Sequence, residues 1–298
     1  MSHRAAALFV LLVAAGTHAH AQATLDVSVS ARAIRPGEAV LFTVRTPVPA
    51  HEVTLQWLDR TVVATSVDTT TWVALAGLDL DTPAGRHDVA VEAATAEGPR
   101  TATVSLSVRP GRFPTRRLRV DPVYVEPPAD VLDRIRTEAA RLDALWAREG
   151  PPVWGSTFGA PVDGRPVGRF GARSVFNGQP RAPHAGEDYA HPIGTPIVAP
   201  GSGTVVLAED LYFTGTTLVV DHGGGLLSLF AHLSSMEVAV GDAVVRDQLI
   251  GRVGATGRVT GPHLHWSVRL GGARVDPSSV VAVLAARGPS TRLAPLPR

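Results

Sequence analysis

The sequence of 298 residues contains no cysteine and no lysine. Without cysteine, the chain has no disulfide, no thiolate metal site and no cysteine nucleophile. Without lysine, Schiff-base catalysis, a P-loop and any lysine-attached cofactor are excluded. All 28 basic residues are therefore arginines, and they nearly balance the 27 acidic residues. With this balance the chain has no broad basic face of the kind that binds nucleic acid, so we expect no nucleic-acid partner.

The start of the chain has the pattern of an export signal. Arg4 supplies a positive charge, residues 5–16 are apolar, and Ala19 and Ala21 offer small side chains for cleavage. The apolar run is too short for a membrane span, which needs about 20 residues; a buried N-terminal helix is the alternative. We therefore expect a signal peptide over residues 1–21. The mature chain is expected to be exported, periplasmic or secreted, and to have no membrane span.

Residues 22–110 alternate between apolar and polar side chains. One such run contains Val40, Phe42 and Val44, and turn sequences such as RPGE at residues 35–38 separate the runs. Several short strands at this spacing predict an Ig-like β-sandwich, which would be an N-terminal accessory domain.

The segment 111–150 is expected to be a linker that contains a helix. Five arginines and two prolines lie within residues 109–120. Such a charge run is usually a solvated face, and contact with an anionic polymer is the alternative. An apolar stripe at helical spacing runs through residues 127–149 and is formed by Val131, Ile135, Leu142 and Leu145. It predicts one helix that packs against a core.

Residues 151–285 are rich in glycine and again read as short strands joined by tight turns. The tail at residues 286–298 lacks apolar periodicity and is expected to be disordered. The predicted fold class is therefore all-β in both domains, with one helix between them.

Six of the eleven histidines lie in the C-terminal region. In GPHLHW, at residues 261–266, His263 and His265 would point to the same face of a strand. Further upstream, His184 and Asp188 stand four residues apart in a segment whose proline and glycine argue against a helix. On a straight strand they would be about 13 Å apart. The segment must bend if both bind one ion, and Gly186 is well placed to allow this.

A mixed set of histidine and aspartate ligands with one open position is typical of a catalytic zinc site. Because the chain has no cysteine, zinc bound by nitrogen and oxygen atoms is the natural choice. Each motif is weak alone, but a further histidine, His232 in LFAHLS, strengthens the metal interpretation.

The segments HAGEDYA, LFAHLS and GATGRVTGPHLHWSV resemble the M23 peptidases, which are zinc endopeptidases of the lysostaphin or LytM type. The resemblance covers roughly residues 155–278. It implies an antiparallel β M23/LytM-type catalytic domain over residues 151–285. It also implies that His184, Asp188 and His265 bind Zn2+, and that His232 and His263 are the catalytic imidazoles. The implied function is hydrolysis of peptide cross-links in bacterial peptidoglycan, with its stem peptides as the binding partner.

Other interpretations compete with this one. Some M23-like domains have lost their metal ligands and activate cell-wall amidases instead; here all five polar positions are filled. The segment VGDAVVRDQLIG resembles the barrel of biotinyl and lipoyl carriers, but such carriers need a lysine. D-Ala-D-Ala hydrolases and hedgehog-like domains also use a histidine pair, in a different sequence context.

Overall fold

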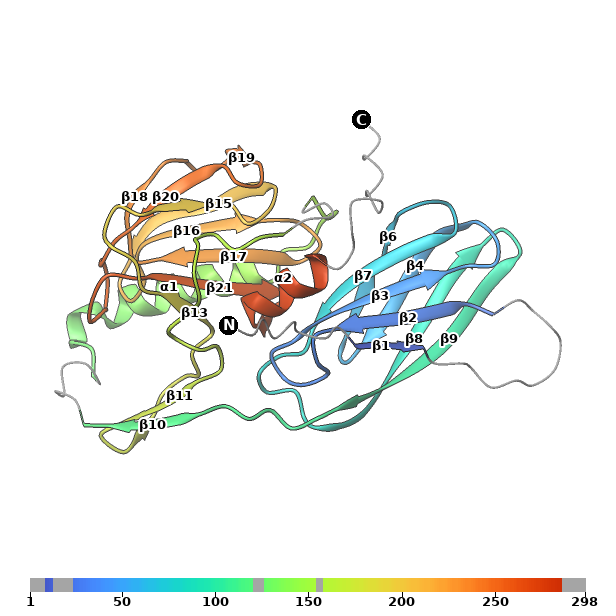
Figure 1. The fold of residues 1–298 in the computed structure, drawn as a ribbon, viewed down its shortest axis with the longest axis horizontal. Helices are drawn as coiled ribbons and strands as arrows, with labels where there is room; N and C mark the ends of the chain where they lie inside the picture. The colour runs from blue at the N-terminus through green and yellow to red at the C-terminus, as the bar shows by residue number, and fades with distance from the viewer. Residues whose placement is uncertain (1–8, 13–23, 120–125, 154–157, 286–298) are drawn as a thin grey trace, which may run out of the picture. The chain divides into compact units, whose positions relative to one another are not determined.

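The computed structural model describes residues 9–12, 24–119, 126–153 and 158–285. The expected tail and most of the expected signal peptide lie outside these ranges. By their contacts the residues divide into two compact units, one mainly up to Gly111 and the other mainly from Arg112 to Ser278 (Figure 1). Within the described ranges, no helix has the length and apolarity needed to cross a membrane.

The first unit contains two antiparallel sheets, with strand orders β1-β2-β3-β7-β6 and β5-β4-β8-β9. The strands are β1 (Phe9–Leu12), β2 (Asp26–Ala31), β3 (Ala39–Arg45), β4 (Ala50–Trp57), β5 (Arg60–Val63), β6 (Thr65–Ser66), β7 (Thr71–Gly77), β8 (Gly85–Thr95) and β9 (Gly98–Val108). The backbone of β1 pairs with β2, so four residues of the expected signal peptide belong to this sheet.

The two sheets enclose a shared apolar core, because alternate side chains of each strand point inward. Val40, Phe42 and Val44 are fully buried on one sheet, and Trp57 is buried on the other. The ring edge of Phe42 meets the Trp57 ring at 5.4 Å between centroids. The indole N–H of Trp57 donates to the Gly77 carbonyl at 2.9 Å, so its one polar atom is satisfied. The predicted β-sandwich is confirmed.

The second unit is also β-rich. A seven-stranded antiparallel sheet has the order β13-β21-β17-β16-β15-β19, with β22 on β21; β14-β20-β18 and β10-β11-β12 form two smaller sheets. Its strands are β10 (Thr115–Leu118), β11 (Arg173–Phe176), β12 (Gln179–Pro180), β13 (Gly186–Tyr189), β14 (Pro196–Val198), β15 (Gly203–Leu211), β16 (Gly215–Asp221), β17 (Leu226–Ala231), β18 (Leu233–Met236), β19 (Ala243–Val244), β20 (Leu249–Val253), β21 (Leu264–Leu270) and β22 (Ala273–Val275).

The linker segment contains a short 3-10 helix, η2 (Ala129–Val131), followed by α1 (Leu132–Trp146). The C-terminal half of the predicted apolar stripe, Leu142 and Leu145, packs together with Trp146 against the seven-stranded sheet, on a core that includes Leu207, Leu211, Val219, Leu227, Leu229 and Ala231. The buried Glu138 carboxylate accepts hydrogen bonds from Arg134 Nε at 2.6 Å and from the backbone N–H of Tyr212 at 2.8 Å. This helix therefore holds the turn between β15 and β16.

The one helix expected between the two domains is α1, and a further helix that the sequence analysis did not predict, α2 (Pro277–Ala285), follows β22. Its start has clear sequence signals: proline suits the first helical position, and the Asp276 carboxylate accepts the backbone N–H of Ser278 at 3.0 Å. Val280, Val283 and Leu284, at helical spacing, are all fully buried. Nine residues among many short strands are too brief for the periodicity to stand out.

His222, next to β16, gives the fold a dependence on pH. Its side chain is 0% exposed; Nδ1–H donates to the Ser202 carbonyl and Nε2 accepts from the Ser228 hydroxyl. Burial lowers the pKa of His222 to about 4, although the Ser202 carbonyl opposes this. In the unfolded chain the pKa is about 6.5. Between these values the unfolded chain binds more protons, so stability is complete above about pH 6.5 and falls as the pH is lowered.

We predict that His222 accounts for about 3 kcal/mol of the stability lost between about pH 6.5 and pH 4. Urea unfolding in the presence of a chelator, at several pH values in this window, measures the effect in the wild type and in His222→Gln. The variant is expected to be less stable at neutral pH and to have a flatter pH dependence. Parallel curves for the two proteins would contradict the assignment.

Candidate metal centre

Neighbouring strands bring together all five polar residues expected at the site. Asp188 on β13 is the register partner of His265 on β21, so both side chains lie on one face of the sheet. On its other side, His265 is the partner of Ala231, the last residue of β17, and His232 follows directly. His184 lies two residues before β13, and His263 lies just before β21.

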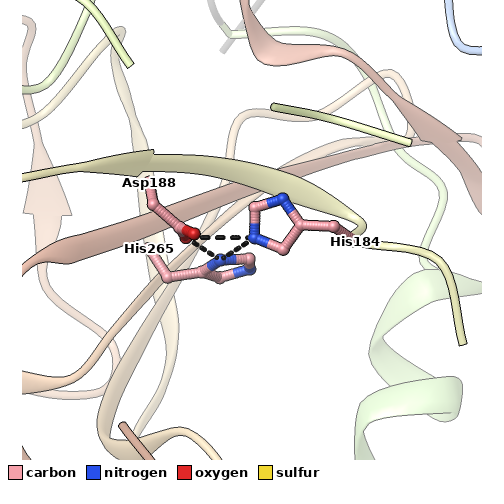
Figure 2. A group of neighbouring side chains, drawn as sticks. All are labelled: His184, Asp188 and His265. Carbon is pink, nitrogen blue, oxygen red and sulfur yellow. Dashed lines mark hydrogen bonds and ion pairs between the residues drawn. The ribbon is translucent and has the colours of Figure 1, made fainter. Parts of the chain in front are cut away.

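Three of these side chains point toward one another (Figure 2). His184 Nε2 lies 3.0 Å from Asp188 Oδ1 and 3.1 Å from His265 Nδ1. His265 Nδ1 lies 2.8 Å from the same Asp188 oxygen. Three possible ligand atoms thus form a nearly equilateral triangle, and each comes from a partly buried side chain.

The triangle fits a metal ion of the size of zinc. His184 Nδ1–H donates to the Arg169 carbonyl at 3.0 Å, so the Nε2 atom of the neutral ring carries a lone pair. Three facing atoms that can each direct a lone pair inward are the ligand set that a cation requires. Tetrahedral zinc places its ligand atoms about 3.3–3.6 Å apart, so small outward shifts would admit the ion. The Arg169 carbonyl is the type of partner that orients a metal-binding imidazole.

Two glycines leave space for this triangle. A methyl group on Gly168 would collide with the Asp188 carboxylate, whose Cβ and Cγ lie 2.7 Å from that position. A methyl group on Gly186 would collide with the Trp266 carbonyl and lie 2.9 Å from the His265 ring. The φ of Gly186 lies outside the left-handed region. Close packing of β13 on β21 is what excludes a side chain there.

His232 and His263 lie side by side next to the triangle, with ring centroids 4.8 Å apart. His232 Nδ1–H donates to the Thr256 carbonyl, and His263 Nδ1–H donates to the Gly261 carbonyl, both at 2.9 Å. Each neutral ring therefore carries its lone pair on Nε2. His263 Nε2 is 3.9 Å from Asp188 Oδ1. His232 has a φ of 66°, an unusual left-handed conformation for a histidine, between β17 and β18.

The electrostatics of the site favour an ionised Asp188. Burial raises the pKa of Asp188, but hydrogen bonds and charges from His184 and His265 hold it well below its usual range. Burial lowers the pKa of His265, and it lowers the pKa of His232 to about 4. For His184, burial acts downward, but Asp188 outweighs it and the pKa is raised. At neutral pH, His232 is therefore able to accept a proton.

The other polar residues of this region do not join the centre. Glu187 points to the opposite face of β13, where it accepts hydrogen bonds from Tyr189 at 3.0 Å and Ser278 at 2.7 Å. Burial and the nearby charge of Asp276 raise the pKa of Glu187 to about 7. His191 Nε2–H donates to the Asp163 carbonyl at 2.9 Å.

Sequence reasoning missed the groups that orient the histidines. These are backbone carbonyls of Arg169, Thr256 and Gly261, and a carbonyl is present at every position of any chain. Gly168 was missed for a related reason, because its importance depends on the bridge that it forms with Asp188, 20 residues further along the chain.

The comparisons with known proteins agree with this geometry. The family model described as "Peptidase family M23" matches residues 182–277, which contain all five polar residues. A crystal structure of a peptidase M23 from Pseudomonas aeruginosa is 32% identical, with a TM-score of 0.64, over 86% of this chain and 96% of that one. The chain therefore has an M23-type peptidase fold, with a group of three residues that could hold a metal ion. It belongs to peptidase family M23.

Two named relatives match only part of the chain. "Peptidoglycan DD-endopeptidase ShyA" of Vibrio cholerae is 40% identical over 113 residues, which are 38% of this chain and 26% of that protein. "DD-carboxypeptidase/endopeptidase Mpg" of Neisseria meningitidis is 42% identical over 97 residues, which are 33% of this chain and 22% of that protein. The chain thus spans about a quarter of the length of these relatives.

We predict that Gly168→Ala weakens zinc binding about 10- to 100-fold, because the new methyl group displaces the Asp188 carboxylate. Gly159→Ala is the matched control, since its methyl group would meet only the flexible end of Arg246 at 3.3 Å. Competition with a zinc-sensitive chelating dye measures both dissociation constants. Equal affinities for the two variants, each with an unchanged circular dichroism spectrum, would show that Asp188 does not bind the metal.

Proposed function

We propose that the protein is a zinc-dependent endopeptidase that hydrolyses peptide cross-links of bacterial peptidoglycan. The observation that carries this proposal is the triangle of His184, Asp188 and His265 beside two further imidazoles. The chain belongs to family M23, and relatives that match part of it are named peptidoglycan DD-endopeptidases. Because such relatives act on the cell wall, we place this enzyme outside the cytoplasm, in the periplasm or secreted.

In this proposal His184, Asp188 and His265 hold one zinc ion and leave one position open. A bound zinc ion supplies Lewis-acid chemistry: it polarises a carbonyl and lowers the pKa of a water molecule to about 7. Asp188 offsets part of the positive charge of the ion. The Arg169 carbonyl keeps His184 in the tautomer that presents Nε2.

The remaining two histidines handle protons and developing charge. His232 is neutral at physiological pH, and its Nε2 takes a proton from the attacking water and returns it to the leaving amine. His263 Nε2 faces the same space and, when it carries a proton, donates a hydrogen bond to the oxyanion. The Thr256 and Gly261 carbonyls keep both Nε2 atoms turned toward the reacting groups.

The alternative is a catalytically silent LytM-like activator of a cell-wall amidase. Such a protein has no need of a metal-binding triangle or of two oriented imidazoles. Here all five side chains are present, and each of His184, His232 and His263 is oriented by its own backbone carbonyl. The geometry therefore favours the enzyme.

We predict that metal ligands and proton-handling residues separate by mutation. Asp188→Ala and His265→Ala should lose stoichiometric zinc. His232→Ala and His263→Ala should keep zinc but lose about 10²- to 10⁴-fold in the rate of hydrolysis. Elemental analysis and initial rates measure both quantities. If His263→Ala loses zinc while His265→Ala retains it, the roles of these two residues must be exchanged.

We predict that the enzyme converts cross-linked muropeptide dimers into monomers, at the D-Ala–diaminopimelate bond rather than at a glycine bridge. A peptide cross-link provides both a carbonyl for the metal to polarise and an amine for a histidine to protonate. Digestion of purified sacculi, followed by chromatography with mass detection, should show dimers lost without new reducing sugar ends. New sugar ends, or intact dimers together with stimulation of an added amidase, would refute the endopeptidase proposal.

A further inference from the structure

The small sheet β10-β11-β12 carries many positive charges and no negative ones. Residues 112–119 and 168–185, which contain its three strands, include no aspartate or glutamate. These two segments contain seven arginines, namely Arg112, Arg116, Arg117, Arg119, Arg169, Arg173 and Arg181. In a chain whose charges are otherwise nearly balanced, this concentration singles out one part of the second unit.

The register of the sheet sorts these arginines onto two faces. Arg116 on β10 is the parallel partner of Ser174 on β11. Arg181 donates its backbone N–H to the Ser174 carbonyl at 2.8 Å, which continues the antiparallel pairing of β12 with β11. Neighbouring residues across a sheet share a face, and strands lie about 5 Å apart. Arg116 and Arg181 therefore share one face, about 10 Å apart, while Arg117 and Arg173 lie on the opposite face.

This sheet is joined directly to the metal centre. Only two residues separate Arg181 from His184. The backbone of His184 donates to the Ala172 carbonyl at 2.9 Å and accepts from the Gly171 N–H at 2.8 Å, just before β11 begins. Gly171 in turn packs against the Phe113 ring next to β10. The arginine row and the candidate metal ligand therefore belong to one continuous hydrogen-bonded segment.

A further cation, Arg258, lies near the residues that orient the catalytic histidines. Arg258 lies two residues after Thr256, whose carbonyl orients His232. Its guanidinium lies 4.4 Å above the centre of the Phe213 ring, and its backbone N–H donates to the Phe213 carbonyl at 3.0 Å. Burial lowers the pKa of Arg258 and the positive charge of Arg181 lowers it further, so the two guanidiniums lie near enough to influence each other.

We propose that Arg116, Arg181 and Arg258 form a subsite that binds free carboxylates of the stem peptides beside the metal centre. This inference rests on the proposed function. A cross-linked stem peptide is anionic, since its acidic residues and its C-terminus carry carboxylates that are not part of the cleaved bond. The planar guanidinium matches a carboxylate with two parallel hydrogen bonds. Such contacts beside the histidines would hold the peptide extended across the catalytic centre.

The two faces of the sheet provide a matched pair of variants. Arg116→Gln/Arg181→Gln removes two charges from the proposed subsite, and Arg117→Gln/Arg173→Gln removes two charges from the opposite face. The substrates are one muropeptide dimer with free carboxylates and the same dimer with those carboxylates amidated. For the free dimer, the first variant should raise KM at least about tenfold, which corresponds to about 1.4 kcal/mol. The opposite-face variant should stay within about twofold, and the amidated dimer should not distinguish the two variants.

Binding is measured separately from cleavage, with a labelled dimer on the zinc-loaded His263→Ala protein, so that the two proposals can fail independently. If the dimer binds through these arginines but the protein with an unchanged sequence never cuts it, the endopeptidase proposal is refuted and the subsite proposal stands. Equal losses for both double variants would overturn the subsite, as would equal competition by an unrelated phosphate polymer. Arg116→Lys/Arg181→Lys, which keeps the charges, should recover part of the affinity; a fully unrecovered KM with an intact fold would also overturn it.

Discussion

The Asp188 carboxylate held between two imidazoles is the interaction on which the site depends. A partly buried negative charge is costly unless nearby groups compensate for it, and here His184 and His265 lie 3.0 and 2.8 Å from one of its oxygens. The register of β13 on β21 places Asp188 opposite His265. Gly168 and Gly186 admit this arrangement because neither carries a side chain. The strand register, the two glycines and the neighbouring imidazoles together hold the Asp188 carboxylate in this position.

The second layer of the site depends on packing further away. Glu138 on α1 accepts the backbone N–H of Tyr212, in the turn between β15 and β16. The Thr214 carbonyl of the same turn accepts the backbone N–H of His232, and the Thr256 carbonyl accepts its Nδ1–H. His232 is thereby fixed in an uncommon backbone conformation. Such a conformation costs of order 1–3 kcal/mol and persists only where the surroundings enforce it.

Much of this protein could be predicted from its sequence, and the rest depended on contacts distant in the chain. Alternating residues such as Val40 and Phe42 predicted the sandwich because period two is a local property. The order of the histidine motifs, which resembles that of M23 peptidases, predicted five polar residues that neighbouring strands do bring together. By contrast, the apolar residues of α2 span only nine positions, which is too few to distinguish a helix from a short strand. The absence of a side chain at Gly168 is important only because Asp188 of β13 lies beside it. The backbone carbonyls that fix the histidine tautomers cannot be recognised from the sequence, because every residue has a carbonyl.

The most direct test of the central claim is a crystal structure with anomalous diffraction recorded on both sides of the zinc absorption edge. The account predicts one zinc peak about 2.0–2.2 Å from His184 Nε2, Asp188 Oδ1 and His265 Nδ1, with the fourth position occupied by solvent. His232 and His263 should face that solvent ligand without binding the ion. A zinc-replete crystal with no peak there, or a peak bound instead by His263 or His232, would contradict the account.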